Sequence, residues 1–233
     1  MTQYTYQERF KTLKGVFDEF TNRNLFELES HKVFDKLLGP VKVGKESNIF
    51  SAQKGDKKII IKIYHLQNCN FNHMFDYIRK DQRYVNLSKK RREIIFAWTQ
   101  REYKNLLKAE NGGVRVPKAL KWKYNILVEE MIGPPAPALK DQYPAYPYQF
   151  LQDILTEVKK LYQCGLIHGD LSAFNILNLD EKPVLIDFSQ STLIKTPNAE
   201  ELLERDMKNV LQFFNKLGVK EDFDKVMERI KKE

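Results

Sequence analysis

Three polar residues in the second half of the chain could bind a divalent metal ion and orient a nucleophile. Asp170 and Asn175 lie five residues apart in IHGDLSAFNIL (167–177), and Asp187 follows Asn175 by 12 residues, in VLIDFSQ (184–190). The sequence between them is typical of strand, turn and strand, which places Asn175 and Asp187 together with Asp170 beside them. An amide and a carboxylate oxygen suit Mg²⁺, and a neighbouring carboxylate can orient a hydroxyl or accept its proton. Any one such residue alone is more often part of a turn, but the combination indicates phosphoryl transfer.

A lysine in an apolar strand and a glutamate on the following helix are the expected partners of this site. Lys62 lies within IIIKIY (59–64), where it is either an edge-strand charge that points to water or a ligand for phosphate oxygens. Glu102, in WTQREYKNLLKA (98–109), is either a surface charge paired along its own helix or the ion-pair partner of Lys62.

The turn before this strand, over residues 43–48, is where a loop that covers phosphates is expected. It does not match G-x-G-x-x-G, because Gly44 is its only glycine. The expected phosphate contacts are backbone N–H groups of the turn, at Gly44 and Lys45, and the hydroxyl of Ser47.

The composition is that of an ordinary globular protein. The 233 residues include 39 Lys and Arg against 31 Asp and Glu, so the formal net charge is +8, and 42% of the residues are hydrophobic. Cys69 and Cys164 lie in no CxxC pair, which excludes a structural zinc site and favours a reducing compartment. No apolar run approaches the ~18 residues of a membrane helix, and the first residues lack the apolar core of a signal peptide. We therefore expect a cytoplasmic protein with no membrane partner.

The hydrophobic pattern predicts an α+β fold with two lobes and a ligand cleft between them. Residues 1–40 are expected to form an N-terminal helical extension that ends at Gly39-Pro40. Residues 41–132 are the expected β-rich N-lobe, and residues 133–233, which begin with a proline-rich hinge, are the expected α-rich C-lobe. The expected elements are a hairpin over 41–66, a helix over 93–110, strands at 119–122 and 125–131, a helix over 148–162, strands at 176–179 and 183–186, and a helix over 199–217.

A basic segment interrupts the N-lobe. Residues 66–92 show no clean period and are expected to be a long, flexible insertion. From Arg79 to Arg92 the segment carries seven basic residues against one acid, Asp81. Such a cluster is either a solvated loop or a site for the phosphates of a nucleotide or nucleic acid.

Taken in order, the motifs resemble the RIO family of atypical protein kinases, most of all its Rio-one branch. The resemblance spans about residues 20–219 and is carried by four stretches: GKESNIF (44–50), IKIY (61–64), HGDLSAFNIL (168–177) and IDFSQS (186–191). It implies a compact two-lobed kinase fold with ATP and Mg²⁺ between the lobes, Mn²⁺ being an alternative ion.

The resemblance also implies a role for each motif residue. Lys62 would bind phosphates, Asp170 would be the catalytic aspartate, Asn175 and Asp187 would bind the metal, Ser47 would touch the phosphates, and the backbone of Glu130 and Ile132 would meet the adenine edge. The family is further associated with ATPase activity through a phospho-aspartate, here at Asp187, and with maturation of the small ribosomal subunit.

The sequence departs from the family pattern at two positions. Ala173 stands where Rio-one proteins usually have an acidic residue, and Glu129 replaces an apolar residue near the adenine pocket. A buried carboxylate at that position needs a partner, so Glu129 either faces out or pairs with a lysine. Only residues 188–197 separate Asp187 from the next helix, so a normal activation segment with its A-P-E anchor does not fit.

Three functions fit these observations. The first is a serine/threonine protein kinase with ATPase activity that also phosphorylates itself, its protein substrate being unknown. The second is an ATP-gated assembly factor on pre-ribosomal RNA or the small ribosomal subunit, bound through the basic segment. The third is a small-molecule kinase of the aminoglycoside or choline type, which the basic insertion and the short C-terminal half disfavour.

Overall fold

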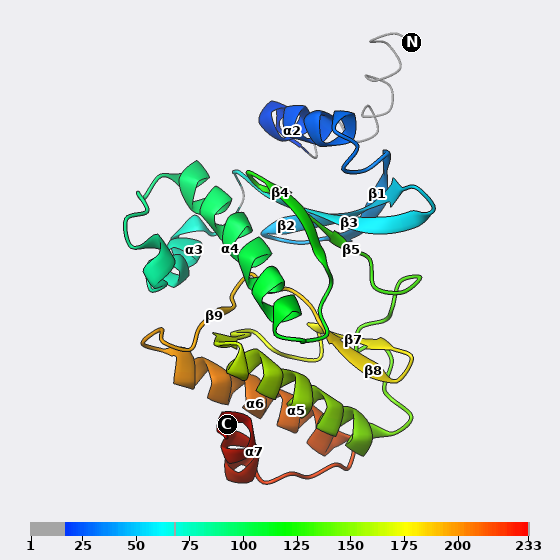
Figure 1. Ribbon diagram of the computed structural model, residues 1–233, viewed down its shortest axis with the longest axis vertical. Coiled ribbons are helices and arrows are strands. Elements are labelled where there is room, and N and C mark those ends of the chain that lie inside the picture. The colour runs from blue at the N-terminus through cyan, green and yellow to red at the C-terminus, as the bar shows by residue number, and fades with distance from the viewer. Residues whose placement is uncertain (1–16, 68, 233) are drawn as a thin grey trace.

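A five-stranded antiparallel sheet forms the first lobe of the computed structural model, which describes residues 17–67 and 69–232 (Figure 1). The order of its strands is β1-β2-β3-β5-β4. The strands are β1 (Lys36–Val43), β2 (Ser47–Lys54), β3 (Lys57–Tyr64), β4 (Ala119–Lys123) and β5 (Ile126–Glu130). The expected hairpin and the two later strands of this lobe are confirmed.

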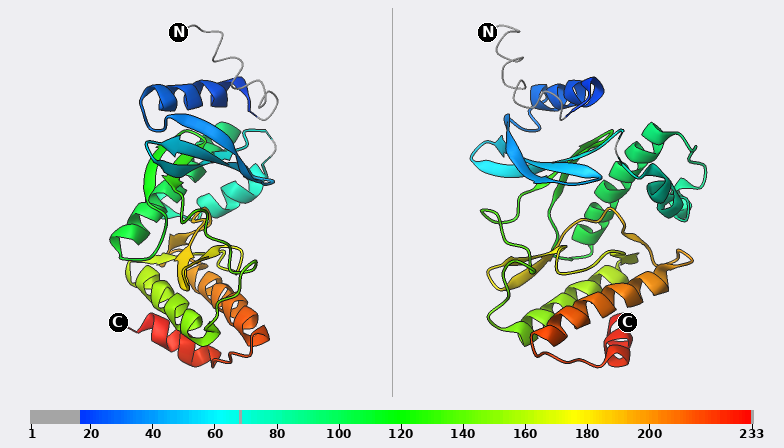
Figure 2. Two further views of the ribbon diagram at one scale, coloured as in Figure 1. Left: turned by 90° about the vertical axis from the view of Figure 1, so that its right-hand side faces the viewer. Right: turned by 180° about the vertical axis from the view of Figure 1, so that it is seen from behind.

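The two faces of the sheet have different partners because side chains alternate along each strand. Ile59, Ile61 and Ile63 of β3 form one apolar face, which packs under helix α2 (Glu19–Ser30) through Leu25 and Leu28. The opposite face carries the alternate residues of β3, among them Lys62, and is turned toward the second lobe. Figure 2 shows α2 lying across the outer side of the sheet.

The second lobe is mostly helical and has its own hydrophobic core. Helices α5 (Pro147–Gln163) and α6 (Ala199–Lys216) lie alongside one another, and α7 (Phe223–Lys231) packs against both (Figure 2). Four short strands pair as β6 (Leu166–Ile167) with β9 (Thr192–Leu193) and β7 (Ile176–Leu179) with β8 (Lys182–Leu185). The proline-rich segment after β5 crosses between the lobes and pairs with β7 through an Ala138–Leu177 bridge. None of the helices in residues 17–67 and 69–232 is long and apolar enough to cross a membrane.

Helix α4 (Arg91–Asn111) connects the two lobes and also supports the basic segment. Within that segment lie helix α3 (Phe71–Ile78) and a 3₁₀ turn, η2 (Gln82–Tyr84). Met74 and Ile78, four residues apart on α3, are buried against α4 at Trp98. The expectation of a loop over 66–92 is therefore wrong for these residues, because an eight-residue amphipathic helix is too short to show a clear period in the sequence.

The expected N-terminal helix is wrong beyond residue 30. The chain leaves α2 at His31 and enters β1 at Lys36, so Gly39 and Pro40 lie within a strand instead of ending a helix. β1 is an edge strand, where a residue without an N–H is tolerated, and two register shifts near this pair bend it. The part of the expected extension at residues 1–16 lies outside the described residues.

Candidate active site

A cavity of about 340 Å³ lies between the inner face of the sheet and the second lobe. Lys62 lines it from the sheet, and Asn175 and Asp187 line it from the other side. A cavity of this size suits a ligand of nucleotide dimensions. The segment after β5 contributes a further wall, which includes Glu130, Met131, Ile132, Pro135, Ala136 and Ala138.

Lys62 is held between two carboxylates that come from different parts of the chain. Its Nζ lies 2.8 Å from Oε1 of Glu102, on α4, and 2.9 Å from Oδ1 of Asp187. Burial lowers the pKa of Lys62, but the charges of Asp187 and Glu102 outweigh burial and hold that pKa well above its ordinary value. The expected Lys62–Glu102 ion pair is confirmed, and Lys62 does not point to water.

Glu102 has a second partner that the sequence analysis missed. Its other carboxylate oxygen accepts a hydrogen bond from the hydroxyl of Tyr64. Burial raises the pKa of Glu102, and the charge of Lys62 opposes this shift. Tyr64 follows Lys62 by two residues in the same strand, so the two side chains share a face. This spacing was the feature of the sequence from which the contact of Tyr64 with Glu102 could have been predicted. The tyrosine thus fixes the orientation of the carboxylate that holds Lys62.

Asp187 is positioned by the β7–β8 hairpin that precedes it. The backbone N–H of Ile186 donates to the carbonyl of Asn175 at 3.0 Å, which ties the two candidate metal ligands together. Asp187 itself has φ of 64°, a left-handed backbone that costs a non-glycine residue about 1–2 kcal/mol. Burial raises the pKa of Asp187, but the charge of Lys62 and its hydrogen bond outweigh burial, so this pKa is lowered and the carboxylate is ionised.

Asn175 and Asp170 lie in direct contact. Nδ2 of Asn175 donates to the backbone carbonyl of Asp170 at 2.8 Å and approaches its Oδ2 at 3.3 Å. Because the amide nitrogen is engaged, the amide oxygen of Asn175 is the atom left for a cation. Burial and the nearby charge of Asp187 raise the pKa of Asp170. The three polar residues singled out from the second half of the sequence are thus brought to one site.

The backbone of the 168–175 loop is held by a buried aspartate that the sequence analysis missed. Asp206 on α6 accepts hydrogen bonds from the N–H groups of Gly169, at 2.7 Å, and Leu171, at 2.8 Å. Burial raises the pKa of Asp206 to about 7, although both hydrogen bonds favour the ionised form. The sequence does contain a hint of this role. Asp206, next to Met207, is an acidic residue at a position where the helical period of α6 calls for an apolar one. On the other side of the loop, Nε2 of His168 lies 3.0 Å from the carbonyl of Ile186.

The turn between β1 and β2 lies near the site, but the three residues expected to contact phosphate do not line the cavity. Gly44 donates its N–H to the carbonyl of Ser47 at 3.0 Å, and neither these two residues nor Lys45 belongs to the cavity wall. Burial raises the pKa of the Glu46 carboxyl in the same turn; the charge of His73 opposes this shift and that of Asp187 adds to it. Phosphate contacts from Gly44, Lys45 and Ser47 remain a prediction.

Glu129 faces the cavity, contrary to both alternatives that the sequence suggested. It lies opposite Ile60 in the β3–β5 ladder and therefore on the same face as Lys62. Its carboxyl has no hydrogen bond or ion pair with any residue in the described part of the chain. Burial, followed by the charge of Glu102, raises its pKa from 4.5 to about 8, so the carboxyl is protonated at neutral pH. Ala173, the other departure, is buried in the core of the second lobe.

The donor set fits a hard cation that shares its shell with a phosphate ligand. No three His, Cys, Asp or Glu side chains converge into a metal site within residues 17–67 and 69–232. Instead, one carboxylate, Asp187, and one amide, Asn175, line the same cavity. Mg²⁺ commonly takes one or two protein ligands of this kind and completes its shell with water and phosphate oxygens.

Comparison with known proteins gives a consistent result. The family described as "RIO domain" matches residues 48–226. RIO-type serine/threonine-protein kinase Rio1 of Haloferax volcanii is 35% identical over 225 residues, which are 95% of this chain and 78% of that protein. The Rio1 kinase of Methanocaldococcus jannaschii is 40% identical over 216 residues, 91% of this chain and 74% of that protein.

A solved structure shows the same fold. The complex of Rio2 kinase with ADP/Mg²⁺ and phosphoaspartate from Chaetomium thermophilum superposes with a TM-score of 0.71 at 21% identity. The match covers 90% of this chain and 66% of that one. The expected two-lobed kinase fold, β-rich in the first lobe and α-rich in the second, is therefore confirmed.

The protonated Glu129 predicts a specific pH dependence of stability. Because its pKa is raised from 4.5 to about 8 in the folded protein, the folded state binds more protons than the unfolded state between these values, and stability falls as pH rises through them. Glu129→Gln does not titrate. We expect its free energy of unfolding, relative to the unsubstituted protein, to rise from pH 5 to pH 8 by about 2–4 kcal/mol.

Urea unfolding at several pH values measures this difference. Glu228→Gln, at an exposed position on α7, is the matched control and should follow the unsubstituted protein. A constant difference between Glu129→Gln and the unsubstituted protein over pH 5–8 would show that the carboxyl is not held protonated.

Proposed function

The chain belongs to the RIO family of serine/threonine-protein kinases, and on this premise we propose that it transfers the γ-phosphoryl group of ATP to a serine or threonine hydroxyl, including its own. The observation that carries the proposal is the contact of Lys62 with both Glu102 and Asp187 beside a cavity that Asn175 also lines. That arrangement supplies a cation for phosphate oxygens and oxygen ligands for a metal at one place. Family membership favours this function over the small-molecule kinase suggested as an alternative from the sequence.

In this proposal different elements of the chain bind the base, the phosphates and the metal ion. The base occupies the cavity beside the segment after β5, where the backbone of Glu130 and Ile132 meets the adenine edge. Lys62 binds the phosphates, and the β1–β2 turn, with Gly44, Lys45 and Ser47, covers them. Asn175 and Asp187 hold Mg²⁺, which would neutralise charge on the phosphate oxygens; Mn²⁺ has the same ligand preferences.

Asp170 orients the attacking hydroxyl and accepts its proton. Its contact with Asn175 places it next to the metal ligands, and Asp206 fixes the backbone on either side of it. Phosphoryl transfer depends on positioning and charge neutralisation, so a rigid aspartate at this place suits the reaction. Burial and the charge of Asp187 raise its pKa, which makes it a better proton acceptor than an exposed aspartate.

The same site can also hydrolyse ATP through Asp187. The related Rio2 structure is described as a phosphoaspartate complex. In our proposal a carboxylate oxygen of Asp187 attacks the γ-phosphorus, ADP leaves, and water hydrolyses the resulting acyl phosphate. The lowered pKa of Asp187 keeps this carboxylate ionised, which is the form that can attack phosphorus.

The basic segment favours a second function, that of an ATP-gated factor in maturation of the small ribosomal subunit in the cytoplasm. Lys80, Lys89 and Arg92 are exposed and have no carboxylate partner among the described residues, whereas Arg79 and Arg83 pair with acids of their own segment. Lys89 and Arg92 lie over the rings of Phe75 and Phe20. Exposed cations without a carboxylate partner, grouped on one segment, suit the phosphates of pre-ribosomal RNA. Kinase activity and RNA binding are compatible, since no described residue of the basic segment lines the cavity.

Replacing the proposed catalytic aspartate tests the first function. Asp170→Asn keeps the shape and the contact with Asn175 but removes the proton acceptor. We expect phosphate incorporation from labelled ATP to fall by about 10²–10⁴-fold, with nucleotide affinity, measured by calorimetry, within a few-fold of the unsubstituted protein. Asp180→Asn, in the exposed β7–β8 turn, is the control and should retain activity. Comparable turnover in Asp170→Asn would remove Asp170 from its role.

Salt dependence tests the second function. The affinity for a small-subunit ribosomal RNA fragment should fall steeply with salt, and neutralising Lys80, Lys89 and Arg92 to glutamine should reduce the slope of log K against log salt by about 2–3. Neutralising Lys54, Lys57 and Lys58, exposed where β2 turns into β3, is the control, because it also removes three positive charges. Binding that is indifferent to salt, or equally weakened by the control, would exclude the basic segment as an RNA site.

A further inference from the structure

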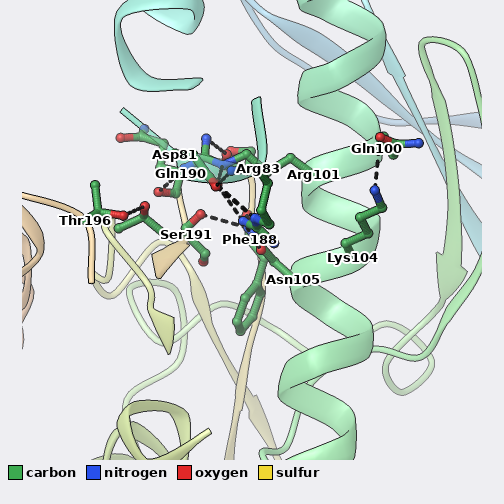
Figure 3. Close-up of polar contacts among 12 residues, drawn as sticks. Asp81, Arg83, Gln100, Arg101, Lys104, Asn105, Phe188, Gln190, Ser191 and Thr196 are labelled. Carbon is green, nitrogen blue, oxygen red and sulfur yellow. Dashed lines mark hydrogen bonds and ion pairs between the residues drawn. The ribbon is translucent and has the colours of Figure 1, made fainter. Parts of the chain in front are cut away.

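A buried arginine on α4 connects the basic segment to the loop that follows Asp187 (Figure 3). The side chain of Arg101 is fully buried. Its Nε lies 3.2 Å from Oδ2 of Asp81, and its two terminal nitrogens donate to the carbonyls of Ser189 and Gln190, each at 3.3 Å. One guanidinium therefore bonds to two segments that are far apart in the sequence.

Asn105, one helical turn after Arg101, repeats this pattern. Its Nδ2 donates to the carbonyls of Phe188, at 3.3 Å, and Ser191, at 2.8 Å. Its Oδ1 accepts from Arg83 of the basic segment at 3.0 Å. Residues four apart on a helix lie on one face, so α4 holds the carbonyls of residues 188–191 along a single stripe.

The other end of this network is a buried carboxylate in the basic segment. Asp81 is fully buried, and its oxygens accept from Arg101 and, at 2.6 Å, from Arg83. Burial raises the pKa of Asp81, but its hydrogen bonds to Arg83 outweigh burial, so this pKa is lowered and the carboxylate is ionised. Arg101 has no other carboxylate partner among the described residues, so its buried charge depends on Asp81.

The carbonyls that accept from Arg101 lie close to Asp187 and to the loop that carries Asp170. Ser189 and Gln190 lie two and three residues after Asp187 in the chain. The carbonyl of Gln190 also packs against Gly169, where a Cβ would approach it to 2.8 Å, so this part of the loop lies against the residue before Asp170. Glu102, adjacent to Arg101, holds Lys62 from the same helix. A displacement of residues 188–190 would therefore move the Asp187 carboxylate relative to Lys62 and Asn175.

We propose that Asp81 and Arg101 are positioning residues for Asp187, so that the basic segment must be docked on α4 for the metal site to be formed. The proposal rests on the proposed role of Asp187 as a metal ligand. Neither residue touches the cavity, and both act through the backbone of residues 188–190. The basic segment thus supports the phosphoryl-transfer site from outside the cavity, in addition to its proposed role in binding RNA.

Mn²⁺ binding in the presence of ADP, followed by electron paramagnetic resonance, tests this without relying on turnover. Asp81→Asn removes the charge that balances Arg101, and Arg101→Lys keeps a cation but loses the fork that reaches two carbonyls. We expect the dissociation constant for Mn²⁺ to rise about tenfold in both variants, as is typical for residues that orient metal ligands. ADP affinity without metal should stay within threefold. Asp76→Asn, which removes only the exposed pair with Arg79, should bind Mn²⁺ like the unsubstituted protein.

Melting temperature and hydrogen exchange distinguish the outcomes. A lower melting temperature with unchanged Mn²⁺ affinity in the folded variants would reduce Asp81 and Arg101 to a structural role and overturn the proposal.

Should both variants fail to fold, hydrogen exchange of the unsubstituted protein provides the test. Because coupling is reciprocal, Mn²⁺ and ADP should slow amide exchange in residues 79–85 together with 187–191. Unchanged exchange in residues 79–85 would overturn it. Absence of Mn²⁺ binding by the unsubstituted protein would instead count against the proposed metal site itself.

Discussion

The contact of one buried ammonium with two carboxylates is the interaction on which the rest of this structure depends. Lys62 meets Glu102, 40 residues away, and Asp187, 125 residues away, so a single side chain joins the sheet, α4 and the second lobe. The Lys62–Glu102 pair is buried on both sides, and removing one partner of such a pair leaves an uncompensated charge at a cost of about 3–5 kcal/mol. The lobes are therefore held in the relation in which the proposed phosphate-binding and metal-binding groups face one another.

Helix α4 acts as the common support of this arrangement. It presents Glu102 to the sheet lobe and, one residue earlier, Arg101 to the loop after Asp187. Only residues 188–197 separate Asp187 from Asn198, the N-cap of α6. The backbone carbonyls at the start of this short connection are bonded by Arg101 and Asn105 of α4, and the carbonyl of Gln190 packs against Gly169.

The sequence allowed the fold class and the convergence of the main candidate site residues to be predicted because their signals are local. Asp170, Asn175 and Asp187 lie at short spacings in the sequence, and apolar residues flank Lys62 directly. Both patterns can therefore be recognised within short stretches of sequence. The residues that were missed act across long distances in sequence: Asp206 through backbone N–H groups, and Arg101 through backbone carbonyls. A side chain that bonds to the backbone has no partner of recognisable type, so the sequence does not indicate what it contacts, even where, as for Asp206, an acid on an apolar helix face marks it as unusual. The edge strand through Pro40 was misjudged for a related reason, since only the position of a strand in its sheet decides whether proline is tolerated.

The irregular course of β1 has a consequence for how copies of this chain meet one another. β1 is an outer strand, and a regular outer strand offers a free row of N–H and C=O groups to which a second molecule can add its own strand. Pro40 lacks one of these donors, the two register shifts twist the strand, and Lys36 and Lys42 place like charges along the same edge. Together these features oppose the pairing of β1 with a strand of another molecule and so disfavour aggregation through this edge of the sheet.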